Sequence, residues 1–355
     1  MKKSVLIFMT LAVFSSCKQQ TDLLPSITGK VNEILVIANK NLWNSPVGDT
    51  LRAYFQQEQD GLPQAEPVFD MLNLPEKNFT RDIKGHRNIL QISISPDVDS
   101  ATIKIQNNPW AKTQKYVRIT APNVPAFYQI FNANKTRLMA LYTKAERERL
   151  MTTYKRTADT KIFNLFKKQF NLLLYCPTGY YINKDTAGFV WISSETKKDS
   201  RGLCFFTEPY THEQQLTPDM IINRVNSELE KFIPGPLDGV TIQRPSNDPA
   251  YKPGEKNEKL IRSYMQLDLS IPYTVNHYQY NGHYALFFRG LWTVTSDFMA
   301  GPYILNVVLD EANNRILYLM GYVYNPNEKK RDMVKQLEAI LNSLVLDIQP
   351  QEKKK

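Results

Sequence analysis

Residues 275–294, VNHYQYNGHYALFFRGLWTV, decide the fold of the second half of the chain. Asn281-Gly282 near the centre is the strongest short signal for a two-residue β-hairpin, because both positions of a type I′ turn need a positive φ. Aromatic and β-branched residues, which favour strands, flank this turn. The stretch therefore predicts two antiparallel strands, over about 275–280 and 284–295.

More strands and two amphipathic helices surround this hairpin. Residues 303–309 and 315–324 have the composition of strands, and Asn313-Asn314 marks the turn between them. Apolar residues at helical spacing predict helices over 217–232 and 333–345. Three further strands are predicted in NLLLYCPTGYYI (171–182), GFVWISSE (188–195) and GLCFFTEPY (202–210).

The first half combines buried strands with helices. Residues 31–38, VNEILVIA, have an unbroken apolar centre, which indicates a strand buried on both faces. Ser45 is expected to cap the next helix, and alternation predicts a strand over 88–95. A long helix follows Pro125, and its charged second half, 144–156, is expected to face solvent. No glycine-rich phosphate loop follows the first strand, which argues against nucleotide binding.

The length of 355 residues suggests two domains, with one large domain as the alternative. We predict an α+β fold with two domains of mainly antiparallel sheet packed with helices. The N-terminal α/β domain is expected over 31–170 and the C-terminal α+β sandwich over 171–348. Residues 244–259 between predicted elements are polar and contain prolines, which indicates a loop.

His277 and His283 are the only close pair of histidines, which raises the question of a metal site. In the predicted hairpin Tyr280 pairs with His283, so side-chain alternation places His277 on the opposite face. Two imidazoles on opposite faces of a sheet do not ligate one ion, and we expect no metal there.

Other catalytic patterns are equally weak. The chain has no GxSxG, HExxH, P-loop or CxxC motif. Glu208 and Glu213 lie near His212, but a polar loop explains them better than an acid–base pair does. His86 and His212 are expected at the surface. We assign no catalytic residues and no cofactor, and the sequence leaves open whether the protein is an enzyme.

Cys176 and Cys204 form an even pair. A meander of the three strands predicted over 171–210 places them on its two outer strands, about 10 Å apart. A disulfide needs Cα atoms closer than about 7 Å, so we expect two reduced, mostly buried thiols. The alternative is that the middle strand pairs at an edge and the two cysteines form a disulfide.

Aromatic residues give the best indication of a binding surface, since tryptophan and tyrosine stack on sugars and fill protein interfaces. The stretch RGLWTVTSDFMAGPY, residues 289–303, places Arg289, Trp292 and Asp297 beside Gly301-Pro302, where backbone can approach a ligand closely. These three residues are the candidate ligand or partner surface. The interpretation that we favour over it is a bulged strand with a buried tryptophan.

The N-terminus has the pattern of a secretory signal over residues 1–17. Lys2 and Lys3 precede an apolar run too short to span a bilayer, and small residues follow it. Ser15-Ser16-Cys17 resembles the lipobox of bacterial lipoproteins, although phenylalanine stands at position 14 where that family usually has leucine. The resemblance implies that Cys17 carries the lipid. The alternative is an ordinary signal peptide, and residues 18–30 are predicted as a tether.

The formal net charge of +9 is spread along the chain, apart from a basic tail at 349–355. Such a charge favours solubility and loose attraction to anionic surfaces. Nothing after Cys17 is apolar enough over enough residues to span a membrane. Nucleic-acid binding has no motif here.

Two family resemblances add to this interpretation. GKVNEILVIANKNLW (29–43), NPWAKTQ (108–114) and GYVYNPNEKKRDMVKQLEAI (321–340), together with the lipobox and the stretch 289–303, resemble a family of Bacteroidota envelope lipoproteins known only as a domain of unknown function. That resemblance implies localisation and no activity. Residues 171–348 are similar to PsbP-like α/β/α sandwiches, which are mostly non-catalytic binding or assembly factors.

From the sequence we therefore expect a lipid-anchored envelope protein facing the periplasm. It is expected to be a non-catalytic binding or assembly component, with the membrane and an envelope protein or glycan as partners. The alternative is a periplasmic hydrolase of cell-wall or glycan substrates. A cleft with carboxylates from both halves would favour the hydrolase, and a broad exposed aromatic patch would favour the binding protein.

Overall fold

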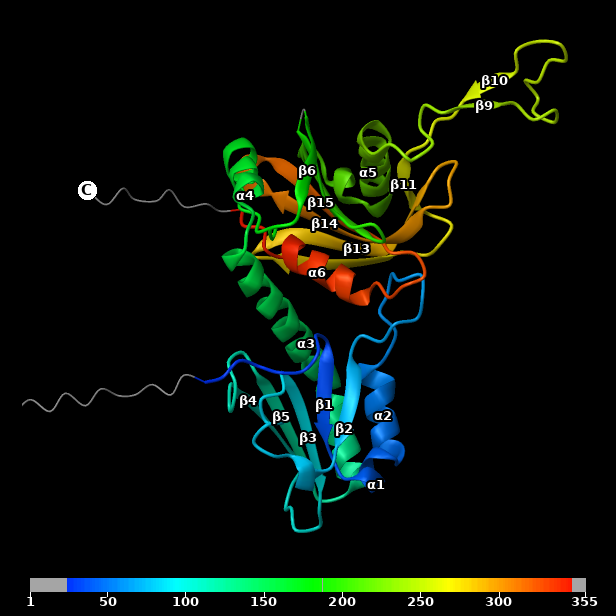
Figure 1. The fold of residues 1–355 in the computed structure, drawn as a ribbon. Helices are drawn as coiled ribbons and strands as arrows, with labels where there is room; N and C mark the ends of the chain where they lie inside the picture. Colours follow the sequence, from blue (N-terminus) through cyan, green and yellow to red (C-terminus); the bar gives the residue numbers. More distant parts are fainter. Residues whose placement is uncertain (1–23, 187, 347–355) are drawn as a thin grey trace, which may run out of the picture.

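The computed structural model describes residues 24–186 and 188–346, and Figure 1 shows two sheets with their helices, one above the other. The predicted signal peptide, Cys17 and the basic tail lie outside the described residues. Helices and mainly antiparallel sheets make up the described chain, so the predicted α+β class is confirmed.

The first sheet has the strand order β2-β1-β3-β5-β4. Three of its four pairings are parallel, and only β4 pairs antiparallel. Every residue of β1 is buried, as predicted. The strands are β1 (Glu33–Ile37), β2 (Asp70–Leu74), β3 (Asn88–Ile94), β4 (Thr102–Asn107) and β5 (Lys115–Ala121).

Helices cover one face of this sheet. They are α1 (Lys40–Trp43), α2 (Pro46–Phe55) and α3 (Val124–Arg156), with the 3-10 helix η1 (Glu76–Asn78) between β2 and β3. The Ser45 side chain accepts a hydrogen bond from the Val47 amide at 3.3 Å, so the predicted cap is confirmed. Phe127 of α3 packs in the first core, whereas Tyr154 packs against the core of the second sheet, so α3 joins the two halves.

The second sheet has the order β11-β13-β14-β15-β8-β7-β6, and β12 pairs with β13. All of these pairings are antiparallel. The strands are β6 (Tyr181–Thr186), β7 (Phe189–Glu195), β8 (Ser200–Pro209), β11 (Met265–Asp268), β12 (Thr274–Tyr280), β13 (His283–Val294), β14 (Ala300–Asp310) and β15 (Arg315–Tyr324), with η4 (Glu311–Asn313) in the last turn.

Helices lie on both faces of the second sheet. On one face, α5 (Pro218–Phe232) follows η3 (Glu213–Leu216) and packs against the side chains of one core. On the other face lie α4 (Thr160–Leu165), the π-helix η2 (Phe166–Phe170) and α6 (Arg331–Leu341). The layers are thus helix, sheet and helix, and the PsbP-like resemblance itself stays a prediction.

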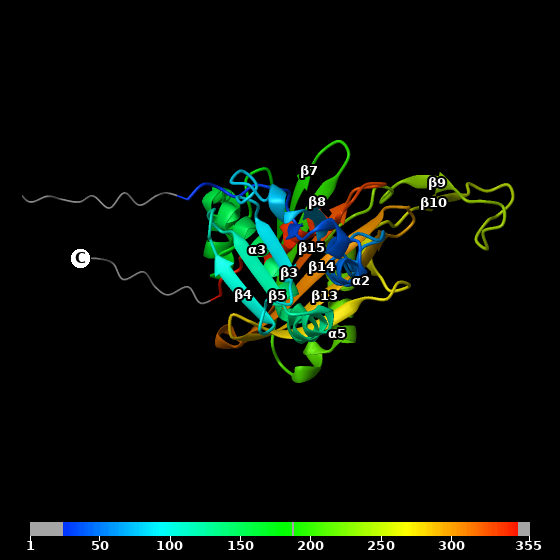
Figure 2. The same ribbon diagram turned by 90° about the horizontal axis from the view of Figure 1, so that it is seen from below.

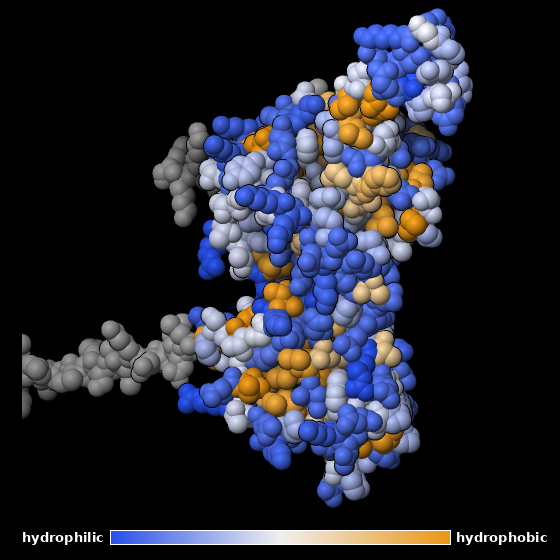
Figure 3. Space-filling view, turned by 45° about the vertical axis from the view of Figure 1, so that its right-hand side comes forward, coloured by the Kyte–Doolittle hydropathy of each residue, from blue (hydrophilic) through white to orange (hydrophobic). Residues whose placement is uncertain are grey.

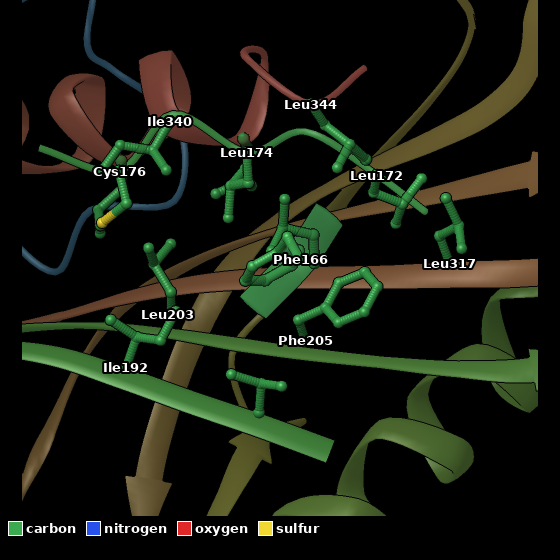
Figure 4. Close-up of a cluster of buried hydrophobic side chains, with 14 of the residues drawn as sticks. Phe166, Leu172, Leu174, Cys176, Ile192, Leu203, Phe205, Leu317, Ile340 and Leu344 are labelled. Carbon is green, nitrogen blue, oxygen red and sulfur yellow. The ribbon is translucent and has the colours of Figure 1, made fainter. Parts of the chain in front are cut away.

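Figure 4 shows the core between the second sheet and α6, where Phe166 lies against Phe205 with 4.9 Å between ring centroids. Ile162 and Phe170 belong to the same core. Residues 160–170 therefore pack with the second sheet, although they follow the long helix of the first half directly. The predicted domain division at residue 171 stays a prediction.

The hairpin predicted from Asn281-Gly282 is confirmed. Both residues have positive φ, 51° and 95°, and Tyr280 pairs with His283. His277 lies on the opposite face from His283, where its Nδ1 is 2.7 Å from the Tyr284 hydroxyl. Within residues 24–186 and 188–346 no group of histidine, cysteine and carboxylate side chains is arranged to hold a metal ion.

The strand predicted over 171–182 is wrong for most of its length. β6 begins only at Tyr181. The segment before it pairs at isolated bridges, one of them between Leu173 and Val345, which exchange backbone hydrogen bonds. Its apolar side chains pack between the sheet and α6, as Figure 4 shows for Leu172, Leu174 and Cys176. An apolar run that fills a layer between elements has the same composition as a buried strand.

Cys176 and Cys204 are both buried and free, so the predicted reduced thiols are confirmed. The meander position predicted for them is wrong, because Cys176 precedes the first strand of the meander, and the two side chains lie in cores on opposite faces of the sheet. Burial raises the pKa of both thiols, which keeps them protonated and unreactive.

A second hairpin, β9 (Thr241–Gln243) with β10 (Glu258–Leu260), projects from the body, and its tip is part of the predicted loop. Figures 1 and 2 show it on the opposite side of the molecule from the N-terminal segment that begins at residue 24. All six strand residues of this hairpin are exposed. The sequence did not predict it, because three-residue strands leave almost no alternation to detect.

The two halves meet at the start of α6. Glu66 of the first half accepts hydrogen bonds from the backbone amides of Lys330 and Arg331, at 2.6 and 3.1 Å, and so caps this helix. Arg331 donates to the Pro67 carbonyl at 2.8 Å and pairs with Asp70 at 2.9 Å.

The segment predicted as a tether, residues 18–30, is attached to the body at Pro25. The carbonyl of Pro25 accepts a hydrogen bond from the backbone amide of Lys112.

Candidate binding site

The three residues predicted as a binding surface are not brought together. Arg289 and Trp292 lie on opposite faces of β13, in keeping with side-chain alternation. Arg289 forms an ion pair with Glu338 of α6, whereas Trp292 is only 2% exposed and donates to the Val323 carbonyl at 3.2 Å. Asp297 lies in the turn between β13 and β14, where its carboxylate accepts from the Phe298 amide.

Gly301 does allow a close approach to its backbone, but the group that approaches is another part of the protein and not a ligand. It lies in β14, not in a turn. A Cβ at this position would lie 2.0 Å from the Val323 carbonyl oxygen and 3.1 Å from Nε1 of Trp292. The glycine therefore allows β15 and the indole of Trp292 to pack tightly.

Trp292 instead forms the floor of a cavity of about 400 Å³, which we call the aromatic pocket. Its walls come from β7, β8, β11, β13, β15 and the segment between α5 and the projecting hairpin. Trp292 and Tyr322 at the floor are buried, whereas Trp191, Met299 and Tyr324 in the walls are partly exposed. The apolar side chains that line the pocket are Trp191, Ile233, Met265, Trp292, Val294, Met299, Tyr322 and Tyr324.

Two tryptophans and a tyrosine fix the shape of this floor. The indole of Trp191 donates to the Tyr322 hydroxyl at 2.9 Å, and the rings of Trp292 and Tyr322 meet edge to face with 5.6 Å between centroids. Gly202 makes room for this arrangement, because a Cβ there would lie 2.1 Å from the Tyr322 ring. Burial raises the pKa of Tyr322 well above its usual value, so the hydroxyl stays neutral.

Part of the rim of the aromatic pocket is charged. It includes Glu195 at the end of β7 and Lys197, Lys198 and Asp199 of the β7–β8 turn, and Pro234-Gly235-Pro236 completes the lining. The turn is held by Thr196, whose hydroxyl donates to Asp199 at 2.9 Å. An apolar aromatic floor below charges of both signs suits a ring with a flat apolar face and polar edges.

Apolar surface continues outside the pocket. Phe298, the neighbour of Met299 in the pocket wall, is fully exposed, and Leu260 of the projecting hairpin is 60% exposed. The Gly235 amide donates to the Ser263 carbonyl at 2.8 Å, which ties the hairpin base to the pocket rim. Figure 3 shows apolar surface below the projecting hairpin. Exposed apolar residues at these positions could contact a partner that enters the pocket.

The predicted acid–base candidates do not form a catalytic group. Both oxygens of Glu208 are occupied, by Arg224 at 2.8 Å and by the Tyr318 hydroxyl at 2.5 Å. His212 is exposed at the start of η3, as predicted. The prediction for His86 is wrong, because its ring is buried and its Nε2 lies 2.9 Å from a carboxylate oxygen of Glu33.

A smaller cavity of about 310 Å³ lies between the halves. It has carboxylates from both sides, with Glu58 and Asp60 from the first half and Glu338 from α6. Glu338 is paired with Arg289, and Glu58 and Asp60 are exposed residues of one loop. Glycoside hydrolysis needs two carboxylates that face each other across a substrate. In this cavity Glu338 faces Arg289, and the hydrolase alternative stays a prediction.

The fold and the pocket thus define an α+β protein with a preformed, aromatic-lined cavity. The chain belongs to the family described as domain of unknown function DUF4837, whose family model matches residues 159–343. A second model, domain of unknown function DUF8532, matches residues 27–155. The search of curated proteins gives no match. Within the described chain, no helix is long and apolar enough to cross a membrane.

Proposed function

We propose that this chain is a lipid-anchored envelope protein that faces the periplasm and binds a partner without catalysis. The observation that carries the binding role is the aromatic pocket, with Trp191 and Trp292 on a rigid sheet and charged residues at the rim. The resemblance of Ser15-Ser16-Cys17 to a lipobox supports the anchor.

The chemistry of the pocket favours two kinds of ligand. The apolar faces of a sugar ring stack on tryptophan and tyrosine, and an aromatic side chain of a protein partner fits the same floor. In both cases the rim charges bind polar groups at the edge of the ring. The proposed partner is therefore a glycan or an envelope protein. The first test of the proposal is whether the partner binds in the aromatic pocket.

Replacing Trp191 by alanine is expected to weaken partner binding at least about ten-fold, because truncation of a central aromatic anchor typically costs more than about 1.4 kcal/mol. Two measurements check this. Affinity capture of the tagged, crosslinked protein from intact envelopes detects a protein partner, and titration with soluble peptidoglycan fragments, followed by the intrinsic fluorescence of the chain, detects a glycan. Tyr181→Ala is the matched control, because Tyr181 is 69% exposed on the edge strand β6 and does not line the pocket. Equal capture by the native chain and both variants would contradict the proposal.

Replacing Cys17 by alanine is expected to abolish acylation and release the body of the protein into the soluble fraction. The physical reason is that the acyl chains are the only firm attachment the sequence offers. Mass spectrometry of the N-terminal peptide and fractionation of cells measure the two effects. Continued presence with membranes after a high-salt wash would show that another attachment exists.

A further inference from the structure

A groove rich in cations runs along the second half of α3. It consists of two adjoining hollows of about 380 and 510 Å³, which share Thr113, Arg149 and Thr152 as lining residues. We call it the basic groove and define it by its six cationic residues: Arg87, Lys112, Lys115, Arg149, Lys155 and Arg156.

Two of these cations are occupied by the protein itself. Glu146, which is buried, pairs with Arg87 at 2.7 Å and with Arg149 at 2.6 Å. The Arg149 guanidinium also donates to the Thr113 carbonyl at 2.7 Å. These residues build the wall of the groove and are not available to a ligand.

The other four cations are wholly or partly exposed. Lys112, Lys155 and Arg156 are exposed, and Lys115 donates to the Asn107 side chain at 2.8 Å. Glu148 is the exposed carboxylate among the residues that line the two hollows, and it lies 3.7 Å from Lys144. The exposed part of the groove therefore has an excess of positive charge.

The groove lies where the lipid anchor would join the body. The Lys112 amide donates to the Pro25 carbonyl at 2.9 Å, and Ser26 and Ile27 line the larger hollow. Cys17 precedes Pro25 by eight residues, and eight residues span at most about 28 Å. A body tied this closely to a bilayer cannot diffuse far from it, and the described chain begins beside Lys112.

We propose that the basic groove rests on the anionic phosphate headgroups of the membrane that holds the lipid anchor. Lysine and arginine within a Debye length of an anionic surface are attracted to it. The proposal rests on the lipid anchor of the proposed function, and it adds an orientation. With this face on the bilayer, the projecting hairpin beside the aromatic pocket lies on the far side of the molecule, as Figures 1 and 2 show.

The test uses the chain from residue 18 to 355, which has no acylated cysteine, with sedimented vesicles at low ionic strength. This chain keeps all of the described residues, 24–186 and 188–346, so it is expected to fold. It should bind vesicles of phosphatidylglycerol and phosphatidylcholine and leave vesicles of phosphatidylcholine alone unbound. The double variant Lys112→Glu with Arg156→Glu should lower the partition coefficient at least about ten-fold, because two attractions become repulsions.

The matched control is Lys252→Glu with Lys256→Glu, which makes the same change in net charge on the projecting hairpin, where both lysines are exposed. It should keep most of the binding, and an equal loss in both variants would overturn the proposal in favour of a general charge effect. Saturable binding of inorganic phosphate without vesicle binding would also overturn it. Because these chains carry no lipid, failure here leaves the acylation test at Cys17 unaffected, and failure of acylation leaves this result standing.

Discussion

Replacing Glu146 by alanine is expected to lower the free energy of unfolding by about 3 to 5 kcal/mol, the usual effect of removing one partner from a buried ion pair. Glu146 lies in α3 and is 3% exposed. Its carboxylate accepts from Asn88 at 2.6 Å, from Arg149 at 2.6 Å and from Arg87 at 2.7 Å. In the alanine variant the guanidinium groups of Arg87 and Arg149, which are largely buried, lose the carboxylate that balances their charge.

The measurement is urea unfolding followed by circular dichroism, with Glu148→Ala as the control. Glu148 is on the same helix two residues later, but it is exposed and 3.7 Å from Lys144, so its loss should change the unfolding free energy by less than about 1 kcal/mol. Equal effects of the two variants would show that the Glu146 cluster does not stabilise the fold as argued. A Glu146→Gln variant should fall between them, since the amide keeps a hydrogen-bond acceptor.

This cluster also shows where sequence patterns fail. The charged stretch 144–156 was predicted to face solvent, and most of it does, but the prediction is wrong for Ala145 and Glu146, which are buried. The partners of Glu146 at Arg87 and Asn88 lie almost sixty positions earlier in the chain. Alternation and helical periodicity report which face of one element is apolar, but they carry no information about ion pairs between elements.

Strands with a local signal were predicted well. The Asn281-Gly282 turn fixes the register of β12 and β13 because both turn residues adopt positive φ, and the register places His277 away from His283. β4 was missed, although Ile103 and Ile105 alternate with the exposed Lys104 and Gln106, the pattern of a strand with one face on a core. Leu172 and Leu174 were assigned to a strand because packing between layers and pairing in a sheet select the same residue types.

The candidate site was predicted only in part. Trp292 was identified from its neighbourhood of aromatic residues, and it does line the aromatic pocket. Trp191 was missed as its companion, because β7 and β13 are brought into one sheet only through the pairings of β8, β15 and β14 that lie between them. Arg289 was grouped with Trp292, although three positions along a strand place two side chains on opposite faces.

The junction between the halves contains a lysine whose charge is costly. Lys335 of α6 is 7% exposed, its ammonium donates to the Val68 carbonyl at 2.6 Å, and it lies 4.7 Å from the centroid of the Phe69 ring. Burial lowers the pKa of Lys335 to about 8, and the nearby Glu338 opposes this effect. Asp332 and Glu146 also favour the charged form, whereas Arg331 disfavours it.

The stability of the native chain is therefore expected to rise with pH across the range in which Lys335 titrates. Its pKa in the folded state, about 8, is below the value of about 10.4 in an unfolded chain, so the unfolded state binds more protons between these limits. Lys335 is charged in both states below pH 8, and the folded state then bears the cost of burying that charge. Deprotonation in the folded state removes this cost as the pH rises.

Lys335→Met isolates this contribution, because methionine fills a similar volume without a titrating group. The unfolding free energy of the native chain minus that of the variant is expected to rise by about 2 kcal/mol between pH 7 and pH 9.5. Urea unfolding at several pH values in this range measures it, and taking the difference cancels titrations that both chains share. Lys329→Met, at an exposed position near the start of α6, should give a flat difference. A flat difference for Lys335→Met as well would mean that the ammonium group is solvated in the folded protein and that the two halves separate enough to admit water at this junction.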